Sequence, residues 1–548
     1  MDMQRPDSHH PMIRGSSVKR LCLLIAVAFG SVAGTTWAQQ SPPTPGSMGG
    51  ASGLRPLGVG LQSEPADGLA LGVRGSVLYS NNLDLQSSTA TDPGHALLEV
   101  APYARYRQNL QRGPVAVDYT LRAQVRDGSG DSFRLRSDLR AVADQRLVDQ
   151  WLRVSALAYI RSVNLNPFVS SSLDPAGQVA NTGQYRNLEI SPYARGDLGG
   201  DGSWNVRYRL RYIDGGQTSV LPFVFAGPNT QNILSAGARS DLERRLLGVS
   251  VDLTRADVSY RNDLDYTNEE YDLLGWLRLS PSLRAGAGVG YSANDRLVNT
   301  AGESSGTGAV AALQWNPSAR TSVAARWADR YYGNQFSVTA DHRGANWVAS
   351  INHSEGVQDG NSANLSLTAI QNAALAELSR VGVDPATLRG LQGSPAALAA
   401  ALADIGLQFS GALNTPLVYF QASRATVALQ GSRSAVQFGI FTADRRSAIT
   451  AIGATAPALR QFGANISGTY RLDSAQAINL SLSHLQSESA SANVESTRNS
   501  LIGSWDWRLS PRWVVSIGAR VQRQTGSGTG VVEFDEVAGF LAADYRLD

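Results

Sequence analysis

The segment from Val115 to Arg126 alternates between two kinds of side chain. Valine, tyrosine, leucine and alanine occupy every second position, and the positions between them carry Ala116, Asp118, Thr120, Arg122, Gln124 and Arg126. Successive side chains of a strand point to opposite faces, so the pattern predicts a strand with one apolar and one charged face. The pattern recurs from Trp204 to Tyr212, where arginines fill alternate positions.

The N-terminus has the three parts of an export signal. Arg14, Lys19 and Arg20 precede an apolar run from Leu21 to Gly34, and a small-residue cleavage site ends at Ala38. We therefore expect residues 1–38 to be a signal peptide cleaved near Ala38. No later run reaches the roughly 18 apolar residues that a spanning helix needs. Half-apolar strands behind an export signal predict a transmembrane antiparallel β-barrel in the outer membrane of a Gram-negative bacterium.

The barrel is expected to fill most of the chain. Residues 39–68 are rich in Pro, Gly and Ser and predict a flexible periplasmic tail, and residues 69–548 predict the barrel. Short and long connections alternate along it, as expected for periplasmic turns and external loops. Counting gives about 22 strands, with 18 to 24 allowed, and places the short turns on one side. A soluble propeller is the all-β alternative, but it would not need long loops confined to alternate connections.

The longest predicted connection, residues 355–415, differs from the others in composition. Three stretches are rich in alanine and leucine: Gln371–Arg380, Pro385–Leu391 and Pro395–Ile405. The last two begin after N-cap residues, and Gly406 follows the third. These signals predict short helices in an external loop. About 22 strands enclose a cylinder on the order of 40 Å wide, and barrels of that size normally carry a plug. We expect this loop to cap or plug the pore; the alternative is an unstructured external loop.

Short motifs resemble a known family. Arg330-Tyr-Tyr-Gly-Asn-Gln-Phe, Asp341-His-Arg and Trp347, with the octapeptides that begin at Leu98 and Leu188, are similar to outer-membrane β-barrels of PEP-CTERM/exosortase systems. The resemblance runs from about Leu69 to Leu547. It implies a barrel linked to export or assembly of a surface exopolysaccharide, with periplasmic export proteins as partners. It supplies no catalytic residues.

The sequence offers little for catalysis or metal binding. The mature histidines are His95, His342, His353 and His484, and none has a second histidine at ligand spacing. The only cysteine, Cys22, lies in the signal. We therefore expect no metal, no cofactor and no enzyme. An outer-membrane hydrolase with a histidine and a serine or aspartate at the rim or wall remains the alternative.

Arginines are the strongest candidate site. The lumen-lining candidates all fall on the predicted inner face: Arg122, Arg126, Arg134, Arg136, Arg140, Arg207, Arg209 and Arg211. They predict either a wall of structural ion pairs or a cationic strip that guides anionic sugars, because guanidinium binds carboxylate through two parallel hydrogen bonds. Tryptophans near strand ends predict interfacial girdles, and sugar stacking is the alternative. They are Trp151, Trp276, Trp315, Trp327, Trp347, Trp505, Trp507 and Trp513.

These observations favour a non-enzymatic channel or assembly component for surface polysaccharide. The expected partners are outer-membrane lipids, anionic polysaccharide and periplasmic export proteins. The net charge of +2 gives no argument for a nucleic acid partner. A purely structural or adhesive barrel is a further alternative.

Overall fold

The computed structural model describes thirteen stretches of the chain, all within one compact unit, Pro45–Asp548. The described residues are 68–83, 94–127, 133–148, 151–164, 182–214, 228–241, 245–260, 265–298, 302–359, 417–448, 458–489, 493–528 and 531–547. The predicted signal peptide, the predicted tail up to residue 67 and the helices expected within residues 371–405 lie outside these stretches, whereas Gly68 begins the first strand. No helix of the described residues is long and apolar enough to cross a membrane.

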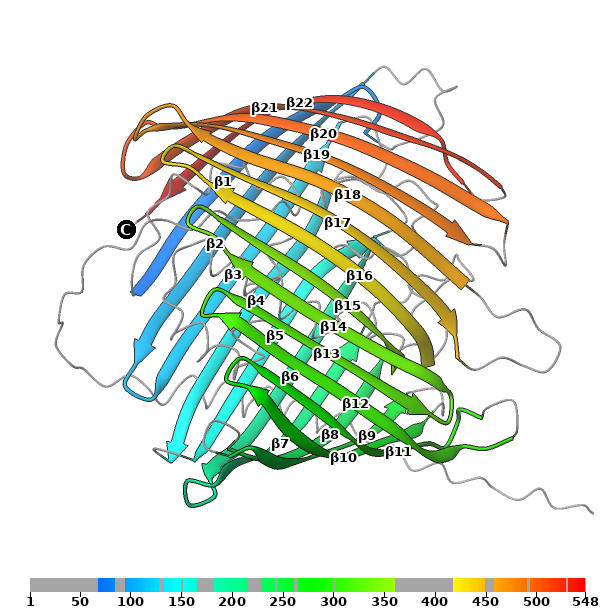
Figure 1. Ribbon diagram of the computed structural model, residues 1–548. Coiled ribbons are helices and arrows are strands. Elements are labelled where there is room, and N and C mark those ends of the chain that lie inside the picture. Colours follow the sequence, from blue (N-terminus) through cyan, green and yellow to red (C-terminus); the bar gives the residue numbers. More distant parts are fainter. Residues whose placement is uncertain are drawn as a thin grey trace, which may run out of the picture. The chain divides into compact units, whose positions relative to one another are not determined.

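The described residues form 22 strands, as the sequence predicted (Figure 1). The strands are β1 (Gly68–Ser80), β2 (His95–Leu110), β3 (Gly113–Arg126), β4 (Phe133–Val148), β5 (Leu152–Asn164), β6 (Thr182–Asp197), β7 (Gly202–Asp214), β8 (Asn229–Ser240), β9 (Leu247–Tyr260), β10 (Tyr266–Ser280), β11 (Leu283–Asn294), β12 (Ser305–Ser318), β13 (Thr321–Arg330), β14 (Gly333–Arg343), β15 (Trp347–Asp359), β16 (Leu417–Gln430), β17 (Ser434–Ser447), β18 (Ala458–Arg471), β19 (Gln476–Ser489), β20 (Val494–Arg508), β21 (Trp513–Ser527) and β22 (Phe534–Arg546).

One antiparallel sheet contains all of these strands and closes on itself. Each strand pairs with its neighbours in the chain, and β1 also pairs with β22, from Gly72 opposite Arg546 to Ser80 opposite Ala538. In Figure 1 the blue first strand therefore lies beside the red last one. A closed ring has no unpaired edge, which is the condition for a sheet to span a lipid bilayer. It also excludes the propeller alternative, which needs several separate sheets.

The two ends of the barrel differ in their connections. Turns such as Gln111–Arg112 between β2 and β3 lie at the end where β1 begins and β22 ends. That end is periplasmic by the rule that short turns of such barrels face the periplasm. The rule was too strict, because short connections also lie at the opposite end, among them the two-residue turn Tyr331–Tyr332 between β13 and β14. The predicted start of the long loop was also wrong, since Glu355 to Asp359 belong to β15.

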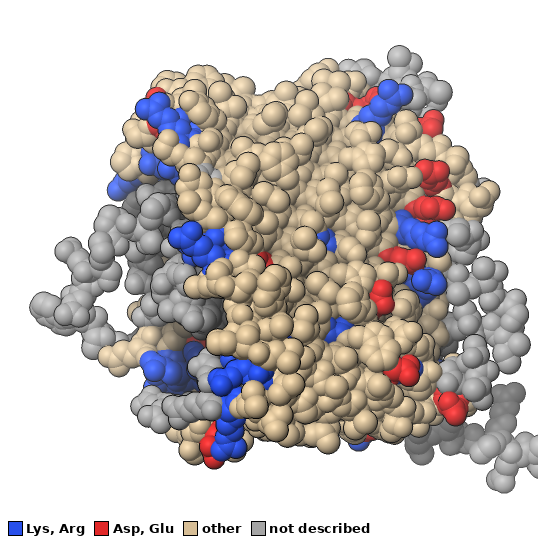
Figure 2. Space-filling model, viewed as in Figure 1, with Lys and Arg blue, Asp and Glu red and all other residues tan. Residues whose placement is uncertain are grey.

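The wall has an apolar outer face and a polar inner face. On β3 the side chains of Tyr119 and Val125 are exposed, whereas Arg122, Gln124 and Arg126 are buried. Register carries this division around the ring, and many large apolar side chains are exposed on the outer face of the described strands. On the face that Figure 2 shows, uncharged residues cover the middle of the wall and charged residues gather toward its two margins. This is the surface that a barrel presents to a hydrocarbon layer.

Most of the predicted girdle tryptophans face outward. Seven of the eight are exposed on this outer side: Trp151, Trp315, Trp327, Trp347, Trp505, Trp507 and Trp513. Trp276 is the exception, because register turns it inward and its Nε1 donates a hydrogen bond to Ser250 Oγ at 2.9 Å. The prediction of an interfacial role for Trp276 was therefore wrong. Strand-end position alone does not fix the face of a side chain.

A buried polar cluster joins the first and last strands. Arg74 on β1 donates to Asp544 Oδ2 on β22 from Nε at 3.2 Å and from Nη2 at 2.8 Å. The Tyr103 hydroxyl on β2 donates to Asp544 Oδ1 at 2.8 Å. Gly72 leaves room for the Tyr103 ring, since a methyl group there would overlap it. The contact between β1 and β22, called the seam below, thus has charge-assisted side-chain hydrogen bonds in addition to the backbone hydrogen bonds of the sheet.

Candidate functional site

The candidate site is the cationic inner wall of β1–β7. Register and burial place its arginines and carboxylates on the lumen face. The arginines are Arg74, Arg105, Arg107, Arg122, Arg126, Arg134, Arg136, Arg140, Arg146, Arg153, Arg195, Arg207, Arg209 and Arg211. The carboxylates are Glu99, Asp118, Asp138, Asp144, Glu189 and Asp197. Among the described residues of these seven strands the arginines far outnumber the carboxylates, so we infer that this part of the wall carries a positive potential.

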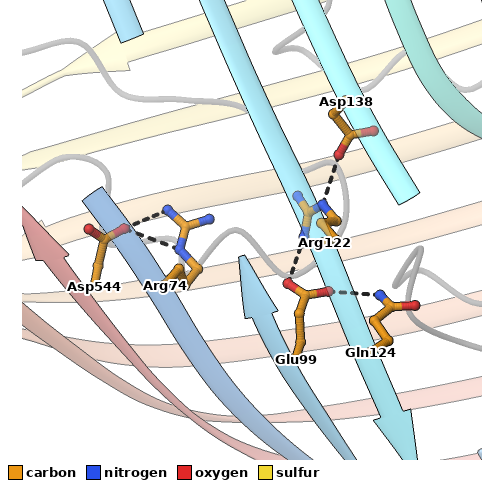
Figure 3. Close-up of polar contacts among 6 residues, drawn as sticks. All are labelled: Arg74, Glu99, Arg122, Gln124, Asp138 and Asp544. Carbon is orange, nitrogen blue, oxygen red and sulfur yellow. Dashed lines mark hydrogen bonds and ion pairs between the residues drawn. The ribbon is translucent and has the colours of Figure 1, made fainter. Parts of the chain in front are cut away.

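Arg122 is the centre of a bonded cluster on β2–β4 (Figure 3). Its Nη1 donates to Glu99 Oε1 and its Nε to Asp138 Oδ2, both at 2.8 Å, so one guanidinium bridges two neighbouring strands. Gln124 Nε2 donates to the other oxygen of Glu99 at 2.8 Å. These contacts agree with the prediction that the arginines form structural ion pairs, as far as Arg122 is concerned. Its guanidinium links side chains of β2 and β4 to β3.

Further arginines surround that cluster. Register places Arg136 directly opposite Arg122, Arg134 opposite Gln124, and Arg140 opposite Asp118. Asp118 also lies 3.8 Å from Arg105 Nε and 3.9 Å from Arg107 Nη2. Several guanidinium groups therefore share few carboxylates. Among the described residues of these strands, arginines outnumber carboxylates.

The three predicted arginines of β7 have three different environments. Arg211 donates to Glu189 Oε2 from Nη2 at 2.7 Å and from Nε at 2.9 Å. Arg207 lies over the Tyr193 ring, with its guanidinium carbon 4.4 Å from the ring centroid. Arg209 Nε has no hydrogen-bond partner among the described residues. Arg211 is thus paired with a carboxylate, Arg207 is stacked on an aromatic ring, and Arg209 has an Nε–H group without a partner among the described residues.

The structure places all eight predicted arginines on the lumen face but divides them into two groups. Five belong to β3 and β4 and three to β7, with β5 and β6 between them. The structural ion-pair interpretation fits Arg122 and Arg211. The arginine excess around them fits the cationic interpretation. The wall therefore contains structural ion pairs, and the guidance of anionic sugars by the other arginines stays a prediction.

Sequence reasoning missed several lumen clusters built by distant residues. On β21 and β22, Arg520 Nη2 donates to Glu536 Oε1 at 2.6 Å, and Ser80 Oγ on β1 donates to the same oxygen at 2.8 Å. On β10 and β13, Arg330 lies 3.0 Å from Asp272 Oδ1. Alternation could have assigned their faces. It could not have identified their partners, which depend on register.

The four histidines are dispersed. His95 Nδ1 lies 3.3 Å from Asp127 Oδ1, His342 Nδ1 2.8 Å from Thr321 Oγ1, and His484 Nδ1 2.8 Å from Asn499 Oδ1. His353 lies on the outer wall between a serine and a glutamate. No group of three or more His, Cys, Asp or Glu in the described stretches is placed to hold a metal ion.

No family model matches the chain, and no curated protein matches it. Solved structures with related folds include the siderophore receptor PirA of Acinetobacter baumannii, at 8% identity and a TM-score of 0.43, covering 88% of this chain and 81% of that one. The FrpB iron transporter of Neisseria meningitidis (F5-1 variant) has 10% identity and a TM-score of 0.42, covering 92% and 88%. Similarity at this level carries no information about a ligand.

The apolar exterior and closed ring decide the location of the protein. It is a 22-stranded β-barrel of the outer membrane. Its outer face contacts membrane lipids, and its inner face provides the charged wall described above.

Proposed function

We propose that this barrel is a channel whose lumen favours anions, and that its cargo is an acidic surface polysaccharide leaving the cell. The preference for anions is supported by the excess of arginine over carboxylate among the described residues on the inner wall of β1–β7. A low-dielectric wall lined by one sign of charge raises the local concentration of counter-charged solutes. Guanidinium groups bind sugar carboxylates with two parallel bonds.

The polysaccharide half rests on the sequence resemblance to barrels of PEP-CTERM systems. Passage of a polymer through a lumen needs binding groups and no bond chemistry, so no catalysis is assigned to the inner wall. Periplasmic export proteins would bind the periplasmic end of the barrel, where the short turns lie. The siderophore receptors and iron transporters with related folds give no support to a particular cargo at their level of similarity.

Ion selectivity in planar bilayers tests the channel. We expect the reversal potential in a salt gradient to lie on the chloride side, and Arg209→Gln to move it toward the potassium side. Arg255→Gln is the matched control, because it removes an equal charge from the outer face, where Arg255 pairs with Asp257 at 3.2 Å. Cation selectivity of the native protein, or equal shifts for both variants, would contradict the proposal.

Blockade by oligosaccharides tests the cargo. An oligogalacturonate added to the periplasmic side should reduce the current more than a neutral maltooligosaccharide of equal length. Triple replacement of Arg134, Arg136 and Arg140 by Gln should remove most of the difference, since these residues surround the Arg122 cluster. Equal blockade by the charged and neutral sugars would refute an acidic polysaccharide as cargo while leaving anion selectivity intact.

A further inference from the structure

A second polar cluster lies on the opposite, lipid-facing side of the wall. Register pairs His353 on β15 directly with Ser423 on β16, and it places Glu355 on the same outward face. The outward direction follows from Ile351, two residues before His353, which is 54% exposed. Alternation along β15 keeps residues two apart on one face. A histidine, a serine and a glutamate therefore lie together on the outer face of the wall.

Their contacts form a line from hydroxyl to carboxylate. His353 Nδ1 lies 2.7 Å from Ser423 Oγ, and His353 Nε2 lies 3.1 Å from Glu355 Oε1. An ionised carboxylate only accepts hydrogen bonds, so Nε2 carries the proton and Nδ1 is left to accept from the serine. A nucleophile hydrogen-bonded to a base, with the base oriented by a third group, is the arrangement of serine hydrolases.

Neighbouring residues support this arrangement. Gln421 Nε2 donates to Glu355 Oε1 at 2.9 Å and holds the carboxylate in place. The Phe336 ring lies 5.7 Å from the His353 ring, between centroids. Thr442 is directly opposite Ser423 on β17, which puts a hydroxyl donor on the other side of the nucleophile. The site thus has a positioned base and a candidate donor for an oxyanion.

The depth of the cluster identifies the class of substrate. Trp347, the exposed first residue of β15, marks the periplasmic boundary of the apolar band. With ~3.4 Å per residue and a tilt of roughly 40°, His353 lies about 16 Å and Glu355 about 21 Å above it. The apolar band of such barrels is about 25 Å tall. The cluster therefore lies in the outer-leaflet half of the band, with Glu355 about 4 Å and the His353–Ser423 pair about 9 Å below its outer boundary, on the side where outer-leaflet lipids contact the wall.

We propose that His353, Ser423 and Glu355 form a lipid-facing site that hydrolyses acyl esters of outer-leaflet lipids. Ser423 Oγ attacks the ester carbonyl carbon as its proton passes to His353 Nδ1. The carbon–oxygen bond to the glycerol breaks, and the leaving oxygen takes that proton as an alcohol. Water then attacks the acyl-serine, gives a proton to His353, and releases the fatty acid as that proton returns to Ser423. Glu355 stabilises the charged imidazole throughout.

Hydrolysis of a diacyl phosphatidylethanolamine in mixed detergent micelles tests the site, with the full mature chain as enzyme. We expect release of free fatty acid, with a loss of at least about 10³-fold in Ser423→Ala and His353→Ala. Glu355→Gln should lower kcat and leave KM for the micellar substrate unchanged, as expected of a positioning residue. His484→Ala is the matched control, because His484 also faces outward and bonds one side chain, Asn499.

Labelling provides a measurement that needs no variant. An alkyl fluorophosphonate should modify the folded native chain, and peptide mapping should locate the adduct at Ser423. Heat-modifiable gel migration of every variant shows whether its barrel is assembled. Absence of both hydrolysis and labelling in the folded native protein would overturn the proposal. So would hydrolysis that survives in folded Ser423→Ala. In either case the three contacts only satisfy polar groups of the wall, and the lumen proposal is unaffected.

Discussion

The ion pair between Arg74 and Asp544 gives the sharpest prediction about stability. The side chains of Arg74 and Asp544 are 6% and 4% exposed, and three hydrogen bonds converge on the carboxylate. Asp544→Ala leaves the Arg74 charge and the Tyr103 hydroxyl buried without this acceptor. Removing one partner of a buried pair costs about 3–5 kcal/mol, so we expect a loss of that size in the free energy of unfolding. Urea titration in detergent micelles, followed by tryptophan fluorescence, measures it.

An exposed pair on the last two strands is the control. Arg523 on β21 lies 3.5 Å from Asp535 on β22, with side chains 66% and 58% exposed. Asp535→Ala should cost about 0–1 kcal/mol, because exposed pairs are screened by water. Joint replacement of Arg74 and Asp544 by leucine should recover most of the loss, since no charge then stays buried. Equal costs for Asp544→Ala and Asp535→Ala would refute the role of the seam cluster.

Three further predictions concern the barrel and its pore. Gly72→Ala should destabilise the barrel by about 1–3 kcal/mol in the same titration because the added methyl overlaps the Tyr103 ring, whereas Gly75→Ala, with no atom within 4 Å of the added methyl, should be nearly neutral. Deletion of residues 360–411, the greater part of the predicted cap, should raise the open conductance in planar bilayers; unchanged currents from a folded deletion variant would contradict a cap. The chain should be extracted only by detergent and show heat-modifiable migration on gels, and recovery in the soluble periplasmic fraction would contradict the membrane location.

The sequence predicted the strands and their faces because alternation with period two is a local property. The pattern around Arg122 assigned the inner face of β3 correctly, and the count of connections led to 22 strands. The same logic placed all eight candidate arginines in the lumen. Each strand alternates apolar and polar residues by itself, so its lipid-facing and lumen-facing sides can be assigned without knowing its neighbours.

Partners could not be predicted in this way, because they depend on register between strands. Arg122 bonds residues 23 and 16 positions away, and a shift of two residues in one strand keeps every face but changes every pair. Strand ends were also uncertain. Glu355 was assigned to a loop because helix signals follow it in the chain, but its backbone pairs with Gln421 of β16. That assignment hid its contact with His353.

The strand β16 connects the two proposals and allows them to be separated. Ser423 points outward to His353, and its neighbour Arg424 lies on the inner face, opposite Asn352 and Phe441. Adjacent residues of one strand thus belong to opposite surfaces of the wall. We expect Ser423→Ala to abolish ester hydrolysis and leave the reversal potential unchanged. Arg424→Gln should move the reversal potential toward the potassium side and leave hydrolysis intact.

The reason is that the wall is a single sheet, and neither side chain crosses it. A neutral residue at 424 removes one positive charge from the lumen, but it keeps the backbone ladder that holds Ser423 opposite His353. Bilayer recordings and fatty acid release from the same purified variants measure both effects. If each replacement changes both quantities, the two faces of β16 are coupled through the sheet. Alternation of side chains would then be insufficient to divide the functions of this wall.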